Sequence, residues 1–199
     1  QFFFFPNPFL MSCFSNYRKF AFKINDLDPN RFWFGNYSIK EKRELHNFLW
    51  LSSIDRKDNA STLRKIILLW NLDNLKYNSL IWETSIISKR IMSWILNADI
   101  ILKNSNFEFR RNFIESVVIQ TNHLKKNFKY EIDHQKKIEV ITTLILSGLV
   151  FKEYEENYVY SLKELEKLIE TFFDNKGFPL TRSPNDLLNY TKYFLLIKE

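Results

Sequence analysis

The segment Ser161–Glu199, SLKELEKLIETFFDNKGFPLTRSPNDLLNYTKYFLLIKE, decides the fold class of this chain. Ser161 with a glutamate three residues later forms a capping box, so a helix is predicted to begin there. The DNKG stretch that closes at Gly177 predicts its end, because glycine accepts the left-handed conformation of a C-terminal cap. Ser183-Pro184 predicts a new start, with serine as N-cap and proline at the first helical position. We therefore expect a helical hairpin whose loop carries Arg182.

Both helices of this hairpin have a predicted buried face, because their apolar residues repeat at helical spacing. In the first helix, the face consists of Leu162, Leu165, Leu168, Ile169 and Phe172. In the second, it consists of Leu187, Leu188, Thr191, Phe194 and Leu195.

Upstream of the hairpin, helical periodicity extends back to Ile39. Helices are predicted over residues 41–54, 82–98, 107–127 and 133–150. Another helix is predicted to begin at Asn59 or Ser61, and its predicted buried face consists of Leu63, Ile66, Ile67 and Trp70. Together they make about seven helices with short loops, as in antiparallel helical hairpins. The sequence predicts an all-α protein, and such a succession of hairpins could build a curved or ring-like array.

Residues 1–40 are aromatic and irregular, and we expect them to pack on the helical body of residues 41–199. Phe20–Ile24 and Arg31–Phe34 alternate as short extended pieces do, and a turn is expected at Asp28-Pro29-Asn30. The single cysteine, Cys13, excludes an internal disulfide framework.

Composition limits the classes of protein and partner. With 199 residues, 45% of them hydrophobic and 17% aromatic, the chain can bury a core, so disorder is not expected. The apolar N-terminal run lacks the basic leader of a signal peptide and is broken by Pro6 and Pro8, and Val140–Phe151 is too short to span a bilayer. No membrane insertion is therefore predicted.

The formal net charge of +6 would suit a polyanionic partner. The lysines are scattered and no nucleic-acid-binding motif occurs, so no nucleic acid is expected as a partner.

No metal or cofactor site is predicted. His46, His123 and His134 are not spaced as ligands on one helix face, and Cys13 has no near partner. The three glycines are scattered, so no phosphate-binding loop is present.

Arg90 is the first candidate for a binding residue. It lies four residues before Trp94 and eight after Trp82, on one stripe of a predicted helix. Stacking between the two indole rings would hold the guanidinium and leave its fork for a carboxylate or sulfate. The alternative is an arginine whose aliphatic part packs on the core while its guanidinium pairs with Glu or Asp.

Other polar residues fall at helix positions that suit a ligand. Gln120 and His123 lie within one turn of each other and could face a sugar, or they could form a satisfied polar edge. His134 and Gln135 open a helix, where backbone donors favour an anion, although an ordinary surface cap is the alternative. Arg182 precedes a helix N-terminus and could hold an anion there, or it could pair with Asp186 or Asp174.

Several segments resemble heparinase II/III-like proteins. Leu45-His-Asn-Phe-Leu-Trp50-Leu resembles the family's LHxFxWL opening, and Trp82 followed by Arg90 and Trp94 resembles its W…R…W helix. Gln120-x-x-His123-Leu124 is similar to RQxxHL, Ser147-Gly148-Leu149 to AGL, and Gly177-Phe-Pro-Leu-Thr-Arg182-Ser183-Pro184 to GGHxxRSP. In order and spacing, the likeness extends over residues 20–199.

The resemblance implies an (α/α) toroid, the helical half of a polysaccharide lyase, normally followed by a β-rich domain. It implies β-elimination in acidic, uronate-containing polysaccharides such as glycosaminoglycans, without a cofactor, and a location in the cell envelope or periplasm. This chemistry needs a group that neutralises the uronate carboxylate, a base and an acid. The implied substrate-binding residues on the concave face are Arg90, Trp94, Trp82, Gln120, His123, Gln135 and Arg182.

The family's catalytic residues do not carry over to this chain. After Ser183-Pro184 there is no Tyr-His, and His134-Gln135-Lys136 stands where Gly-Asn-His would fall. Gln135 would misplace its amide, and a misplacement of about 1 Å can cost about 10²-fold in rate. The chain stops at Glu199, where the β-rich domain would begin. We therefore expect an incomplete toroid that is inactive alone; a non-catalytic structural or polysaccharide-binding module is the alternative.

Overall fold

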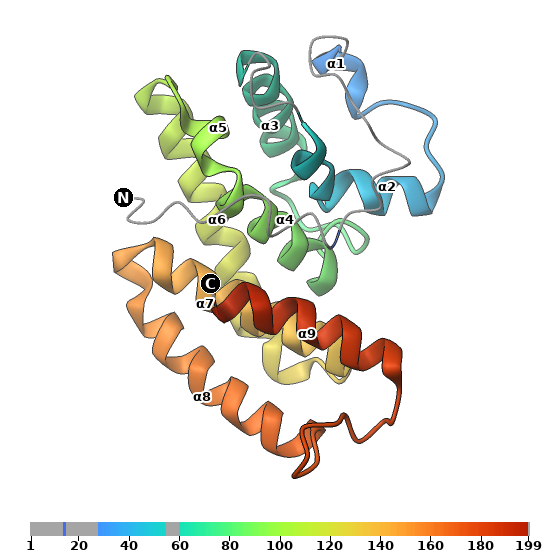
Figure 1. The fold of residues 1–199 in the computed structure, drawn as a ribbon. Helices are drawn as coiled ribbons and strands as arrows, with labels where there is room; N and C mark the ends of the chain where they lie inside the picture. The colour runs from blue at the N-terminus through green and yellow to red at the C-terminus, as the bar shows by residue number, and fades with distance from the viewer. Residues whose placement is uncertain (1–13, 15–27, 55–59, 199) are drawn as a thin grey trace. The chain divides into compact units, whose positions relative to one another are not determined.

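The computed structural model describes residue 14, residues 28–54 and residues 60–198. These residues form α-helices joined by loops and short 3-10 turns, and no strand occurs among them (Figure 1). Their single isolated bridge joins Phe173 to Pro179. The all-α prediction is therefore confirmed. The predictions for Cys13, for Phe20–Ile24 and for a cap at Asn59 lie outside the described residues.

The chain divides into two compact units between Gln120 and Thr121. We call the described residues up to Gln120 the N-terminal unit and those from Thr121 onward the C-terminal unit. Helix α6, Phe107–Asn127, is continuous through the division. In the described part of the chain, no helix is both long and apolar enough to cross a membrane.

Short and medium helices build the N-terminal unit. They are α1 (Pro29–Phe32), α2 (Ile39–His46), the 3-10 turn η3 (Leu49–Ser53), α3 (Ala60–Asn74), α4 (Thr84–Leu96), α5 (Ala98–Leu102) and the first part of α6. Ten of the thirteen residues of α4 are buried, as expected for a helix that is surrounded by others.

Aromatic rings form the core of the N-terminal unit. The Trp94 ring lies 5.1 Å from that of Phe48, 5.4 Å from that of Trp70 and 5.3 Å from that of Phe113, measured between centroids. Because α3, α4 and α6 each contribute to this cluster, it fixes their positions within the unit.

Two predictions for this unit are wrong. The predicted helix 41–54 breaks at Phe48, which has a left-handed φ of 59°, and only the 3-10 turn η3 follows it. Arg31–Phe34, predicted as extended, belongs partly to α1, because Asp28 caps the backbone N–H of Asn30. The proline read as a turn signal is the first residue of this helix.

The C-terminal unit centres on α7, His134–Val150, which packs against both α8 (Glu155–Phe172) and α9 (Pro184–Lys198). Figure 1 shows α8 and α9 as the two arms of a hairpin. The short 3-10 turns η4 (Phe128–Tyr130) and η5 (Lys152–Tyr154) flank α7.

Gly148 lets α8 approach α7 closely. A Cβ atom at this position would lie 2.5 Å from the backbone nitrogen of Tyr158 and 2.9 Å from the carbonyl oxygen of Tyr154. No side chain fits there without moving one of the helices. The glycine in the Ser-Gly-Leu segment is therefore a packing residue.

The hairpin prediction is correct for the second start and wrong for the first. The Ser183 hydroxyl accepts from the backbone N–H of Asp186 at 3.2 Å, which is the predicted N-cap. Ser161, however, is buried in the middle of α8, which begins at Glu155. Gly177, with φ of 78°, shapes the loop rather than the helix end, because α8 already stops where Phe173 turns extended.

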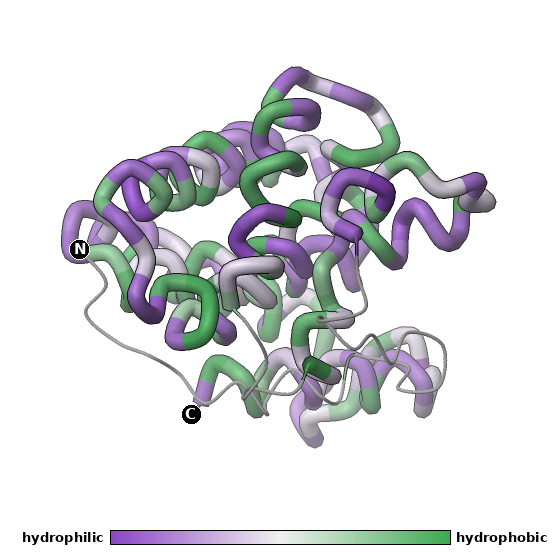
Figure 2. The backbone as a smooth tube through the Cα atoms, turned by 90° about the horizontal axis from the view of Figure 1, so that it is seen from above, coloured by the Kyte–Doolittle hydropathy of each residue, from purple (hydrophilic) through white to green (hydrophobic). Residues whose placement is uncertain are grey.

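The buried face of α9 also differs from the predicted one. Tyr190, Tyr193 and Leu196 are buried, whereas Leu188 and Leu195 are more than half exposed. Apolar residues occur on several sides of α9, so their spacing alone did not select a face; Figure 2 shows this mixture of hydrophobic and hydrophilic residues along the helices. The Tyr193 hydroxyl donates to Glu139 of α7 at 2.7 Å, and this buried bond fixes the face.

Candidate functional site

Arg90 of α4 is fully buried, and its donors bind uncharged acceptors. Its Nε donates to the side-chain oxygen of Gln120 at 2.6 Å. Its terminal nitrogens donate to the carbonyl oxygens of His46 at 2.9 Å and of Ile81 at 3.3 Å. The guanidinium lies 4.3 Å from the ring centroid of Trp70. We call Arg90, Gln120, His46 and Trp70 the arginine hub.

Both sequence interpretations of Arg90 need correction. The terminal N–H groups of its guanidinium are not free to bind a ligand, because they donate to backbone carbonyl oxygens. It also has no carboxylate partner among the described residues, and the ring beneath it is Trp70 of α3 rather than Trp82 or Trp94. Burial lowers the pKa of the guanidinium. The hub ties α2, α4 and α6 together from inside; a contact between Arg90 and a ligand stays a prediction.

The neighbouring predicted residues are also interior. Gln120 is fully buried, and its amide nitrogen donates to the Ser116 carbonyl at 3.1 Å. Trp94 is fully buried in the aromatic core. Trp82, which precedes α4 instead of opening it, donates its indole N–H to the Asn74 carbonyl at 2.9 Å. In this structure these three side chains support the fold.

His46 is a member of the hub that the sequence did not indicate. Its Nδ1 accepts from the indole N–H of Trp70 at 2.9 Å, which places its own proton on Nε2. Its ring stacks on that of Trp33 at 5.2 Å between centroids. Burial, with the positive charges of Arg90 and Lys42, lowers the pKa of His46 to about 4. The imidazole is therefore neutral at neutral pH.

The other predicted residues belong to the C-terminal unit. His123, in the last part of α6, is half-buried, and burial lowers its pKa. Gln135 is half-buried in the first turn of α7. Next to it, the exposed His134 stacks on Phe172 of α8, with 3.6 Å between ring centroids. This contact joins the start of α7 to the end of α8.

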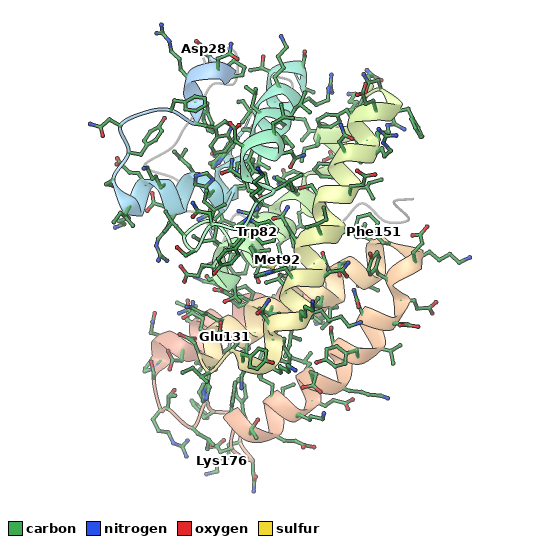
Figure 3. All side chains as sticks on the ribbon, turned by 180° about the vertical axis from the view of Figure 1, so that it is seen from behind. Asp28, Trp82, Met92, Glu131, Phe151 and Lys176 are labelled. Atoms are coloured by element: carbon green, nitrogen blue, oxygen red, sulfur yellow. The ribbon has the colours of Figure 1, made fainter. Side chains whose placement is uncertain are left out.

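Five lysines surround the connection from α6 to α7, and we call them the lysine corner. They are Lys125, Lys126, Lys129, Lys136 and Lys137. The two carboxylates in the same stretch, Glu131 and Asp133, accept hydrogen bonds from backbone N–H groups there (Glu131 is labelled in Figure 3). Tyr130 is 70% exposed, and the ammonium of Lys129 lies 4.8 Å from its ring centroid.

Arg182 lies in the loop between α8 and α9, whose tip is marked by Lys176 in Figure 3. The guanidinium is exposed and pairs with Asp174 at 2.6 Å, one of the two partners that the sequence suggested. Its backbone has a left-handed φ of 55°. The pKa of Asp174 is lowered because the carboxylate accepts from the backbone N–H of Phe178, from Arg182 and from the N–H of Lys176.

A pocket of about 450 Å³ opens beside this loop. Its lining comes from the end of α8, the loop and α9: Ile169, Glu170, Phe173, Asp174, Asn175, Gly177 and Phe194. It contains no residue that the sequence singled out as a ligand contact. Among the described residues, no group of three His, Cys, Asp or Glu side chains could hold a metal ion.

The structure thus joins Arg90 to Gln120 in the N-terminal unit and places His123, Gln135 and Arg182 in the C-terminal unit. The sequence did not indicate the lysine corner, because its lysines lie on two helix ends and a 3-10 turn and form no basic face on a single helix. No family model matches the chain, and no curated protein and no solved structure is significantly similar to it.

Proposed function

We propose that this chain is the helical part of a heparinase II/III-like polysaccharide lyase and that its C-terminal unit binds acidic, uronate-containing polysaccharide. The segments that resemble the family, and the packing of both α8 and α9 on α7, support this proposal. An incomplete (α/α) toroid is part of the proposal. Completion by a β-rich domain belongs to it as well.

The lysine corner is the observation that carries the proposed binding. The stretch contains five lysines and two carboxylates, and both carboxylates accept hydrogen bonds from backbone N–H groups. The ammonium of Lys125 also donates to the side-chain oxygen of Asn157 at 2.8 Å. Uronate carboxylates or sulfates would pair with the ammonium groups, and the exposed ring of Tyr130 offers a flat apolar surface for a sugar. The exposed end of Arg182 supplies a further positive charge in the same unit.

For β-elimination, a positive group must offset the charge of the uronate carboxylate, so that a base can remove the proton from C5. The C4–oxygen bond then breaks, the C4–C5 double bond forms, and an acid protonates the leaving oxygen. The lysine corner and Arg182 are candidates for the first role. We assign no base or acid to this chain.

The test is binding of oligouronates and of sulfated uronate-containing oligosaccharides to the full chain, measured by titration calorimetry at low and high salt. The variant Lys126→Gln/Lys129→Gln is expected to weaken binding by about tenfold or more, with a reduced salt dependence. The matched control is Lys152→Gln/Lys163→Gln, which removes the same charge from exposed positions after α7. Equal weakening by both double variants would leave net charge alone as the cause and would refute the site.

A second candidate is a non-catalytic, polysaccharide-binding or structural module. The lack of Tyr-His after Ser183-Pro184 and of Gly-Asn-His near Gln135 favours it. The ultraviolet absorbance of unsaturated uronate products distinguishes the two functions when the chain is assayed together with any β-rich domain that follows it. Product formation supports the lyase, and binding without product across acidic polysaccharides supports the module.

A further inference from the structure

The pocket beside the α8–α9 loop has a different chemistry from the lysine corner. Its apolar walls include Phe173 and Phe194, whose ring centroids lie 5.7 Å apart with the planes tilted by 48°. Its polar lining includes the carboxylates of Glu170 and Asp174, and no basic side chain lines it. Aromatic faces and carboxylates attract the same kind of ligand, one that carries a positive charge.

The end of α8 adds to this negative potential. Glu170 lies in its last turn and Asp174 follows two residues after its end, where the carbonyl groups of the helix already carry partial negative charge. The last turn of α8 contains no basic residue. Acidic residues at a helix C-terminus oppose the helix dipole and lower stability, so helix formation does not explain them.

Asp174 is held in place as an anion. Its Oδ1 accepts from the backbone N–H groups of Lys176 and Phe178, both at 2.9 Å, and its Oδ2 faces Arg182, which lies outside the pocket lining. Glu170, by contrast, is exposed and forms no ion pair with any described residue. The pocket therefore offers one fixed carboxylate, partly neutralised, and one carboxylate available to a ligand.

We propose that this pocket binds a primary ammonium group carried on an apolar ring. The ammonium pairs with Glu170 and lies near Asp174, while the carbon ring packs against Phe173 and Phe194. A pocket of about 450 Å³ accommodates such a small molecule. The proposal goes beyond the proposed function and does not depend on it, because an acidic sugar would be repelled by this lining.

The experiment is a titration of the full chain with cyclohexylammonium, followed by NMR shifts of the protein amides, with cyclohexanol and cyclohexanecarboxylate as ring-matched probes. We expect the ammonium to bind and to shift amides around Gly177, with cyclohexanol at least about tenfold weaker and the carboxylate without effect. Glu170→Gln should weaken ammonium binding by about tenfold. Glu156→Gln removes the same charge near the start of α8 and should leave binding unchanged.

Equal binding of ammonium and alcohol would overturn the proposal, as would full affinity in Glu170→Gln. Loss of affinity in both glutamine variants would also overturn it, because it would reflect net charge alone. A Phe194→Leu variant tests the apolar wall separately and should weaken all bound probes. These results are independent of polysaccharide binding by the lysine corner, so failure of one proposal does not imply failure of the other.

Discussion

Two arginines that look alike in the sequence have opposite environments in the structure. Arg90 of the N-terminal unit is fully buried, is bonded to three uncharged acceptors and lies on the Trp70 ring. Arg182 of the C-terminal unit is exposed, has a left-handed backbone and pairs with one carboxylate. The first guanidinium therefore belongs to the core of its unit, whereas the second reaches solvent.

This difference in burial predicts how much each arginine contributes to the stability of the fold. Burying a guanidinium without a carboxylate partner costs much free energy unless its N–H groups are hydrogen-bonded. Removing Arg90 would in turn leave its buried acceptors without a donor, which also costs free energy. An exposed ion pair contributes little to stability, because water screens it. Stability measurements should therefore separate the two residues clearly.

The largest expected effect is that of Arg90→Met. This change leaves the side-chain oxygen of Gln120 and the carbonyls of His46 and Ile81 without their donor around a buried position, so we expect a loss of about 3–5 kcal/mol in the free energy of unfolding. Urea unfolding followed by circular dichroism measures it. A loss below about 1 kcal/mol would show that these groups find other partners and would contradict the hub.

The next effect is a pH dependence caused by His46. Its pKa is lowered to about 4 in the folded state, against about 6.5 when unfolded, so the unfolded state binds the proton more tightly. Stability from the neutral imidazole is present above about pH 6.5 and is lost as the pH falls toward 4, by on the order of 3 kcal/mol.

His46→Gln keeps an acceptor that does not titrate and provides the control for this pH dependence. The free energy of unfolding of the natural chain should fall more between pH 7 and pH 4 than that of the variant. Parallel pH profiles of the two proteins would mean that His46 does not contribute to the pH dependence of stability. This result would contradict the lowered pKa of His46 and its place beside Arg90 in the arginine hub.

The smallest expected change in stability is that of Arg182→Gln. Because the Arg182 side of its pair with Asp174 is exposed, loss of this pair should lower the free energy of unfolding by at most about 1 kcal/mol. Affinity for acidic oligosaccharides should nevertheless fall, which calorimetry would detect. A large loss of stability with unchanged affinity would reverse the roles assigned to the two arginines.

Long helices with clear signals were predictable. The bounds of α6 agree with the prediction, and the Asp133 cap of α7 and the Ser183 cap of α9 lie at the predicted starts. The break at Phe48 was not predictable, because the left-handed residue there is a phenylalanine and not a glycine. Ser161 was a false start, since its capping-box pattern occurs within a helix whose true start has no capping side chain.

The site was less predictable than the fold. The spacing of Trp82, Arg90 and Trp94 correctly placed the last two on a stripe of one helix, but the ring that receives the guanidinium belongs to α3. The lysine corner spans a helix end, a 3-10 turn and a helix start, so no single periodicity reveals it. The aromatic and acidic pocket combines α8, its loop and α9, and no segment alone contains it.

The sequence by itself determined that this chain is helical, where most helices lie and which polar residues are unusual. Only the tertiary structure decided which of those residues are interior and which reach solvent. The physical reason is that helical periodicity describes one helix at a time, whereas burial depends on which neighbours cover its faces. An arginine becomes part of the core or part of a surface through those neighbours, here Trp70 and Gln120 for Arg90 and an open loop for Arg182.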